Sequence, residues 1–247
     1  MFYQDKKVNS KQDLLRSYSK DEFSSPFRST IPLIELYFEN KEVLQQIIPN
    51  YNDFETIFEK KTKIKESKRA SFSDLCLKNN STFYCIEAKR TEPKYETVGK
   101  FLKKDERHKT VLNGWLELIN KRCNTKLSIN DVDNITYQMI HRFASACDIP
   151  KDKKAELLYF CFDINENKKN YYYSELLKII NLTKGKVPIK LVLFKINTSS
   201  FFSELEERWT INKQRKLSSV IKEAMNKKVM NIVLDKIIEV KYIGGNK

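Results

Sequence analysis

Two carboxylates and a lysine stand out in the sequence because each interrupts a segment that otherwise has the composition of an apolar strand. Asp74 lies within SFSDLCL (71–77), and Glu87 and Lys89 lie within TFYCIEAK (82–89). Side chains alternate between the two faces of a strand, so Glu87 and Lys89 point to the same side. Carboxylates and a lysine held together in this way can bind a metal cation and act on a phosphate ester.

The short stretch between the two segments determines which residues face each other. KNNS (78–81) has the composition of a turn, so the sequence predicts a β-hairpin. If Asn80 and Ser81 form a two-residue turn, the register places Asp74 opposite Glu87 and Cys76 opposite Cys85. The two carboxylates and the lysine then share one face of the hairpin.

Two carboxylates that face each other across strands repel unless a cation lies between them. Mg²⁺ takes oxygen ligands and keeps several waters, so two carboxylates and a substrate phosphate suffice to hold it. Such a metal makes its bound water a better nucleophile and offsets charge at the phosphate. A neighbouring lysine orients that water or stabilises developing negative charge. We therefore predict a phosphodiester-cleaving site at Asp74, Glu87 and Lys89, with Mg²⁺ as the cofactor and Mn²⁺ as its substitute.

The alternative is a hairpin whose charges merely face water. Against this alternative, both faces of the hairpin contain apolar side chains. One face has Leu75, Leu77, Ile86 and Ala88, and the charged face also has Phe72, Cys76, Phe83 and Cys85. Charges placed among phenylalanine and cysteine side chains need partners or a metal.

The hairpin lies among alternating helices and strands. Apolar periodicity predicts helices at 11–19, 31–48, 96–121, 131–147 (capped by Asp131) and 171–181, and further strands at 54–60, 156–164 and 189–196. This order predicts an α/β fold with a mixed central sheet flanked by helices. We expect one domain over 1–247, with a core at about 31–200 and a basic, helical C-terminal extension at 201–247.

Asp74, the twelve residues after it and the Glu87-Ala88-Lys89 triplet resemble the PD-(D/E)xK nuclease superfamily, which has the restriction-endonuclease-like fold. In that family an aspartate on one hairpin strand is followed by a (D/E)-x-K triplet on the next. The family core runs αβββαβ, and the elements predicted over 31–164 follow that order. Ser73 stands where the motif name has proline, at a position that varies in the superfamily.

The resemblance implies further site residues. Glu35, in the first predicted helix, corresponds to a glutamate that the family often adds, and the Ala88 carbonyl is a family-style metal ligand. Gln138 and Arg142, one helical turn apart, loosely match a motif on the helix after the hairpin. Arg90 directly follows the triplet and could touch the substrate backbone. Without the resemblance, Glu35 is equally well explained as a half-exposed acidic residue on a helix. Gln138 and Arg142 could then make ordinary hydrogen bonds.

The charge balance supports a polyanionic partner. The chain of 247 residues has 46 lysines and arginines against 32 acidic residues, a formal net charge of +14. Such an excess favours nucleic acid, whose binding is driven by counterion release and is strongly salt-dependent. The lysine-rich stretches 60–69, 100–109 and 213–228 could line a nucleic-acid cleft, although each alone also fits a solvated surface.

The remaining composition indicates a soluble protein of a reducing compartment. The start, MFYQDKKVNS, lacks the apolar stretch of a signal peptide, and no apolar run is long enough to span a membrane. Five cysteines without C-x-x-C spacing favour buried thiols over disulfides or zinc, so we expect a cytoplasmic location. With only His108 and His141, a histidine-rich metal site is excluded. We interpret His141 as structural and His108 as part of a solvated charged run.

Three hypotheses follow. The first is a Mg²⁺-dependent endonuclease of restriction or defence type. The resemblance favours double-stranded DNA as its substrate and, because many relatives are homodimers, a homodimer as its assembly. Repair and recombination nucleases share the same core. The second is a non-catalytic nucleic-acid-binding protein on the same fold. The third is a basic scaffold protein in which the hairpin charges are structural.

Overall fold

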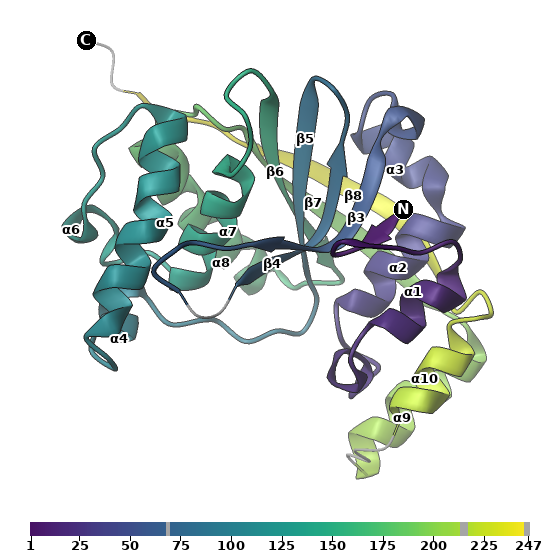
Figure 1. Cartoon of the computed structure of the whole chain (residues 1–247). Coiled ribbons are helices and arrows are strands. Elements are labelled where there is room, and N and C mark those ends of the chain that lie inside the picture. Colours follow the sequence, from purple (N-terminus) through teal and green to yellow (C-terminus); the bar gives the residue numbers. More distant parts are fainter. Residues whose placement is uncertain (68–69, 213–216, 245–247) are drawn as a thin grey trace.

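The computed structural model describes residues 1–67, 70–212 and 217–244. Its centre is an eight-stranded mixed sheet in the order β2-β1-β3-β4-β5-β6-β7-β8 (Figure 1). The strands are β1 (Phe2–Tyr3), β2 (Lys6–Lys7), β3 (Glu55–Thr62), β4 (Ser71–Lys78), β5 (Thr82–Lys89), β6 (Lys154–Phe162), β7 (Ile189–Thr198) and β8 (Met230–Val240).

Helices flank this sheet, as the sequence predicts for an α/β fold. The α-helices are α1 (Lys11–Ser17), α2 (Thr30–Glu39), α3 (Lys41–Ile47), α4 (Val98–Leu102), α5 (Arg107–Cys123), α6 (Ile129–Val132), α7 (Tyr137–Cys147), α8 (Glu166–Leu182), α9 (Ser200–Asn212) and α10 (Ser218–Ala224). Two short 3₁₀ turns, η1 (Lys20–Phe23) and η2 (Tyr51–Asp53), lie before α2 and β3.

The predicted hairpin and its register are confirmed. Strand β4 runs antiparallel to both β3 and β5, and Cys76 pairs with Cys85 across β4 and β5. The turn forms because the Asn79 side chain accepts hydrogen bonds from the backbone N–H groups of Ser81 (2.9 Å) and Thr82 (2.8 Å). Strand β6 is parallel to β5 and β7, and β8 closes the sheet antiparallel to β7.

The alternation of side chains divides the core into two layers, one on each face of the sheet. Leu75, Ile86 and Ala88 pack with α1, α2, α3, α9 and α10 on one face. Cys76 and Cys85 pack with α5, α7 and α8 on the other. Figure 1 shows these two groups of helices on opposite sides of the central strands. Glu87 and Lys89 follow Cys85 by two and four residues, so they lie on the same face of the sheet, which α7 covers.

The prediction of a wholly helical extension at 201–247 is wrong in its last part. Helices α9 and α10 are present, but Met230–Val240 forms the long strand β8 against β7. This segment is rich in isoleucine and valine, which favour strands over helices. Pairing with β7 also satisfies backbone groups that would otherwise be left open at the sheet edge.

The helix predicted at 31–48 is two helices, because Asn40 interrupts it. Asn40 is completely buried, and its side-chain amide donates to the Glu35 carbonyl at 3.1 Å. Its Oδ1 accepts from the backbone N–H of Ile232 in β8 at 3.2 Å. These bonds to the backbone compete with helix continuation, as is typical of asparagine.

The helices predicted at 96–121 and 131–147 are also divided. Asp105 accepts from the Arg107 N–H at 2.9 Å and thereby starts α5 separately from α4. Asp131 does not cap the second helix. It forms a reciprocal capping box with Ser128 around the short α6. The N–H of Thr136 donates to the Glu175 carboxylate at 2.7 Å, which fixes a separate start for α7.

Among the described residues, no helix is both long and apolar enough to cross a membrane. Two of the predicted basic stretches include residues 68–69 and 213–216, which lie outside the described part of the chain.

Candidate active site

A polar hollow of about 330 Å³ lies at the ends of β4 and β5 that carry Asp74 and Lys89. We call it the carboxylate hollow. Its lining comes from η1, the start of α2, the three antiparallel strands, the loop after β5 and α7: Glu22, Arg28, Ser29, Thr30, Glu59, Ala70, Ser71, Phe72, Asp74, Glu87, Ala88, Lys89, Glu92, Tyr95, Gln138, His141 and Arg142.

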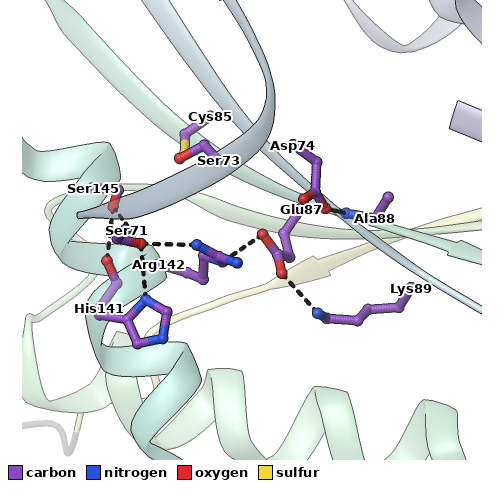
Figure 2. Close-up of polar contacts among 10 residues, drawn as sticks. All are labelled: Ser71, Ser73, Asp74, Cys85, Glu87, Ala88, Lys89, His141, Arg142 and Ser145. Carbon is purple, nitrogen blue, oxygen red and sulfur yellow. Dashed lines mark hydrogen bonds and ion pairs between the residues drawn. The ribbon is translucent and has the colours of Figure 1, made fainter. Parts of the chain in front are cut away.

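Asp74 is held in place by the neighbouring strand. Its Oδ2 accepts a hydrogen bond from the backbone N–H of Ala88 at 2.7 Å (Figure 2). Burial and the nearby Glu87 carboxylate raise its pKa to about 7, although Arg142, Lys89 and the Ala88 N–H act in the opposite direction. Asp74 therefore exchanges its proton near neutral pH.

Glu87 is the ionised centre of the hollow. It is only 2% exposed, and Lys89 Nζ lies 2.7 Å from its Oε1 while Arg142 Nε lies 2.6 Å from its Oε2 (Figure 2). Burial alone would raise the pKa of Glu87, but Arg142 and Lys89 outweigh it and hold that pKa below its usual value. Burial also acts to lower the pKa of Lys89, yet Glu87, Tyr95 and Asp74 raise it overall. The carboxylate and the ammonium therefore both stay charged.

Glu59 on β3 is a site residue that the sequence reasoning missed. Its backbone has φ of +50°, an unusual conformation for glutamate within a strand. Burial, Asp74 and Glu22 together raise its pKa to about 9. Phe58 pairs with Leu75 and Lys60 pairs with Ser73, so Glu59 lies beside Asp74 of β4. The register of β3 against β4 is therefore the signal that could have identified Glu59 as a site residue.

A chain of hydrogen bonds connects Arg142 to His141 through Ser71 (Figure 2). Arg142 Nη1 donates to Ser71 Oγ at 2.8 Å, and Ser71 Oγ lies 3.0 Å from His141 Nδ1. Burial and the nearby cations Arg142 and Lys89 hold the pKa of His141 well below its usual range, so its imidazole is neutral. The residue interpreted from sequence as structural thus forms part of the wall of the hollow.

Six of the eight residues predicted for the site lie together in the carboxylate hollow. They are Asp74, Glu87, Ala88, Lys89, Gln138 and Arg142. Arg90 lies elsewhere, because its guanidinium donates to the Pro26 carbonyl at 2.9 Å and to Glu206 at 2.7 Å. These contacts hold the N-terminal loop and α9 against the end of β5.

Glu35 also lies outside the hollow. It is completely buried on α2, whose apolar side chains pack on the opposite face of the sheet. Lys11 Nζ lies 2.6 Å from Glu35 Oε1, and the Val229 N–H donates to Oε2 at 3.3 Å. Burial raises the pKa of Glu35, although Lys11 and Val229 partly oppose that effect. This glutamate connects α1 and α2 to the start of β8.

We expect Lys11→Met to lower the free energy of unfolding by about 1–3 kcal/mol at pH 8, because the buried Glu35 carboxylate loses its cation. The loss should be smaller at pH 5 than at pH 8, because burial raises the pKa of Glu35 and removal of Lys11 takes away a cation that opposes that rise. Urea denaturation at both pH values measures this effect, with Lys7→Met on the exposed strand β2 as the control. Equal losses in the two variants would contradict the assigned role.

The donors in the hollow fit a hard divalent cation. Asp74 and Glu87 offer carboxylate oxygens, and Ala88 between Glu87 and Lys89 offers a backbone carbonyl. Burial, and after it the neighbouring carboxylates, raise the pKa values of Asp74 and Glu59, and a bound cation would act against both effects. In the described part of the chain, however, no group of three histidine, cysteine, aspartate or glutamate side chains is arranged to hold a metal ion. A cation here would rely on two carboxylates, a backbone oxygen and water.

The fold and the hollow define an α/β protein with a mixed sheet and a charged polar site at the ends of its central strands. A family model described as "Domain of unknown function (DUF6946)" matches residues 6–199, and the chain belongs to that family. All residues of the carboxylate hollow lie within the matched region. No curated protein and no solved structure gave a match.

Proposed function

We propose that the protein is a Mg²⁺-dependent nuclease that hydrolyses phosphodiester bonds in DNA, in a restriction or defence role. The observation that supports this best is the meeting of Asp74, Glu87 and Lys89 in one hollow on paired strands. The order of α2 and α3, the β3–β5 meander, α7 and then β6 also agrees with a restriction-endonuclease-like core.

In this proposal Asp74 and Glu87 hold the Mg²⁺ ion together with the Ala88 carbonyl. A bound Mg²⁺ ion supplies Lewis-acid chemistry, since it makes water more nucleophilic and offsets charge on the phosphate. Asp74 is already positioned for this by its bond from the Ala88 N–H, which fixes the carboxylate against β5. The high pKa of Asp74 means that it must lose a proton before it can act as a ligand.

Lys89 places a permanent positive charge beside the reacting phosphate. Its ammonium is 3% exposed and held by Glu87 at 2.7 Å, so it requires little reorganisation to act. Tyr95 further limits its movement, because the Lys89 Nζ lies 5.2 Å from the centre of that ring. From this position Lys89 can orient the attacking water or stabilise the negative charge that develops on the phosphate.

Arg142 and Gln138 come from the same helix and face the hollow. Arg142 holds Glu87 and Ser71 together, so its first role is to keep the Glu87 carboxylate ionised and oriented. Gln138 lines the hollow and is the candidate for contact with a substrate phosphate. The net charge of +14 then favours the approach of a nucleic-acid backbone from any direction.

A second candidate function is nucleic-acid binding without catalysis on the same fold. The pairing of Glu87 with both Lys89 and Arg142 favours it, because each carboxylate oxygen already has a cationic partner. In that case the three residues form a buried ion-pair network that orders the hollow.

We expect plasmid DNA to be cut in Mg²⁺ or Mn²⁺, to stay intact in EDTA, and to stay intact with Asp74→Ala protein in either metal. Asp152→Ala, an exposed change in the loop before β6, is the matched control and should cut normally. Binding without cutting by the wild-type protein would favour the second function. Cutting at equal rates by Asp74→Ala protein would contradict the assigned site.

A further inference from the structure

A second hollow, of about 740 Å³, adjoins the carboxylate hollow. We call it the aromatic hollow, because Phe101, His108, Trp115, Tyr137 and His141 line it. The two hollows share Ala70, Ser71 and His141, so they meet along one wall. A ligand that extends across this wall reaches the candidate phosphate site at one end and aromatic rings at the other.

The rings of the aromatic hollow are held rigidly. Phe101 stacks between His108 and Tyr137, with ring centres 3.8 and 3.6 Å away. His108 Nδ1 lies 2.6 Å from the Phe101 carbonyl oxygen, and Trp115 Nε1 donates to the Tyr137 hydroxyl at 3.2 Å. These neighbours cover both faces of Phe101, so a planar ligand would stack on the outer face of His108 or Tyr137, and the ordered rings lose little side-chain entropy when it does.

His141 gives the shared wall a fixed hydrogen-bonding group. Arginine only donates, so Ser71 Oγ accepts from Arg142, and the same Oγ lies 3.0 Å from His141 Nδ1. With Nδ1 in that contact, Nε2 is the ring nitrogen that can bond to a ligand, as donor or acceptor according to the tautomer. Planar apolar faces combined with a few fixed polar groups are what a heteroaromatic base requires.

We propose that the aromatic hollow binds an unpaired nucleobase whose neighbouring phosphate lies in the carboxylate hollow. The substrate class is then DNA with an unpaired base beside the phosphate, in a single strand or in a locally opened stretch of supercoiled plasmid, since a base stacked and paired in a duplex cannot enter. This inference rests on the proposed nuclease function for the reaction itself, whereas base binding is tested separately from it.

The test is binding in EDTA, where no cutting takes place. Fluorescence anisotropy compares a labelled single-stranded oligonucleotide with an abasic strand that has the same number of phosphates. We expect wild-type protein to bind the base-containing strand about tenfold more tightly, since one stacked base contributes that much or more. Both His141→Ala and Thr110→Trp should reduce this ratio towards one, the second by filling the hollow from the exposed Thr110 on its rim.

Thr110→Trp enlarges an exposed side chain and should leave the fold intact. This variant therefore tests the inference even if His141→Ala protein does not fold. Phe201→Ala is the control, because Phe201 is an aromatic residue that is 49% exposed on α9, and its loss should leave the ratio unchanged. Equal affinity of wild-type protein for both strands would overturn the inference. An unchanged ratio in folded Thr110→Trp protein would also overturn it.

The two proposals fail in different ways. Base-dependent binding without metal-dependent cutting removes the nuclease proposal and leaves the base site. The opposite result is metal-dependent cutting by a protein that binds base-containing and abasic strands equally, and that binds a single strand no better than a duplex of the same sequence. This result removes the proposal of a base site and leaves the nuclease proposal.

Discussion

In Mg²⁺, Lys89→Met protein is expected to cut DNA at least about a hundredfold more slowly than the wild type, which is the scale of losing a positioned charge or proton-transfer group. Methionine keeps most of the length and apolar volume of lysine, so the change removes the ammonium with little loss of packing. The initial rate of conversion of supercoiled plasmid to nicked and linear forms measures the effect.

The fold should survive this change because Glu87 keeps a second cation. Arg142 remains 2.6 Å from the other carboxylate oxygen of Glu87, so the buried negative charge is not left alone. Lys153→Met is a matched control at the opposite end of β5 and β6, where the Lys153 ammonium donates to the Asn79 carbonyl at 3.0 Å. A Lys89→Met protein that is folded and cuts as fast as this control would exclude Lys89 from catalysis.

At pH 8, Glu59→Gln protein is expected to be more stable than the wild type by about 1–2 kcal/mol, which corresponds to a melting temperature roughly 2–8 °C higher. Burial, Asp74 and Glu22 all raise the pKa of Glu59, so at pH 8 the folded protein must hold a proton that the unfolded chain releases. Glutamine keeps the shape and needs no proton. The Glu59 side chain lines the hollow and is partly exposed, so solvent screens part of this unfavourable interaction.

The sign of the pH dependence follows from the raised pKa. The folded protein holds the Glu59 proton up to a pKa of about 9, whereas the unfolded chain releases it near the ordinary value of 4.5. The stability that this proton contributes is therefore fully present below the ordinary pKa of 4.5 and is lost as the pH rises through 9. Glutamine takes up no proton and loses nothing over this range, so its advantage should be larger at pH 8 than at pH 5.

Glu55→Gln is the control for this prediction. Glu55 begins the same strand, is 41% exposed and pairs with Lys78 at 2.7 Å on the surface. Its replacement should cost less than about 1 kcal/mol and give no gain at pH 8. Thermal unfolding at pH 5 and pH 8 compares the two variants, and a Glu59→Gln protein less stable than the wild type at pH 8 would show that Glu59 is not electrostatically strained.

The hairpin is the part of the fold and site that the sequence predicts best, because its information is local. Alternation along two short strands places Glu87 and Lys89 on one face, and the composition of a four-residue turn fixes the register that pairs Cys76 with Cys85. Apolar periodicity predicts a helix at this part of the chain, but not the face of the sheet that it covers. Gln138 and Arg142, which the family resemblance suggested, line the hollow from α7.

The errors arise where distant segments meet. Nothing in the sequence near Glu35 indicates that Lys11 neutralises it on the far face of the sheet. The sequence near Arg90 likewise gives no sign of its partner Glu206, which lies on α9. The sequence alone does not single out Glu59, because this residue begins a strongly basic stretch and resembles the many charged residues of an exposed surface.

The predicted helix boundaries are wrong for a related reason. Apolar periodicity continues through Asn40 and Thr136, so it predicts unbroken helices there. Asn40 binds the backbone of Ile232, and Thr136 binds Glu175, and both partners are far away in the sequence. Such tertiary hydrogen bonds decide where a helix ends, and periodicity carries no information about them.

The position of β8 at the edge of the sheet has a consequence for synthesis. The strands that build the carboxylate hollow are complete once β6 has left the ribosome, but β7 keeps an open edge until residues 230–240 are made. An unpaired edge of apolar strands is the surface through which nascent chains associate. Strand β8 is therefore the segment that closes this edge and shields the sheet from association with other chains.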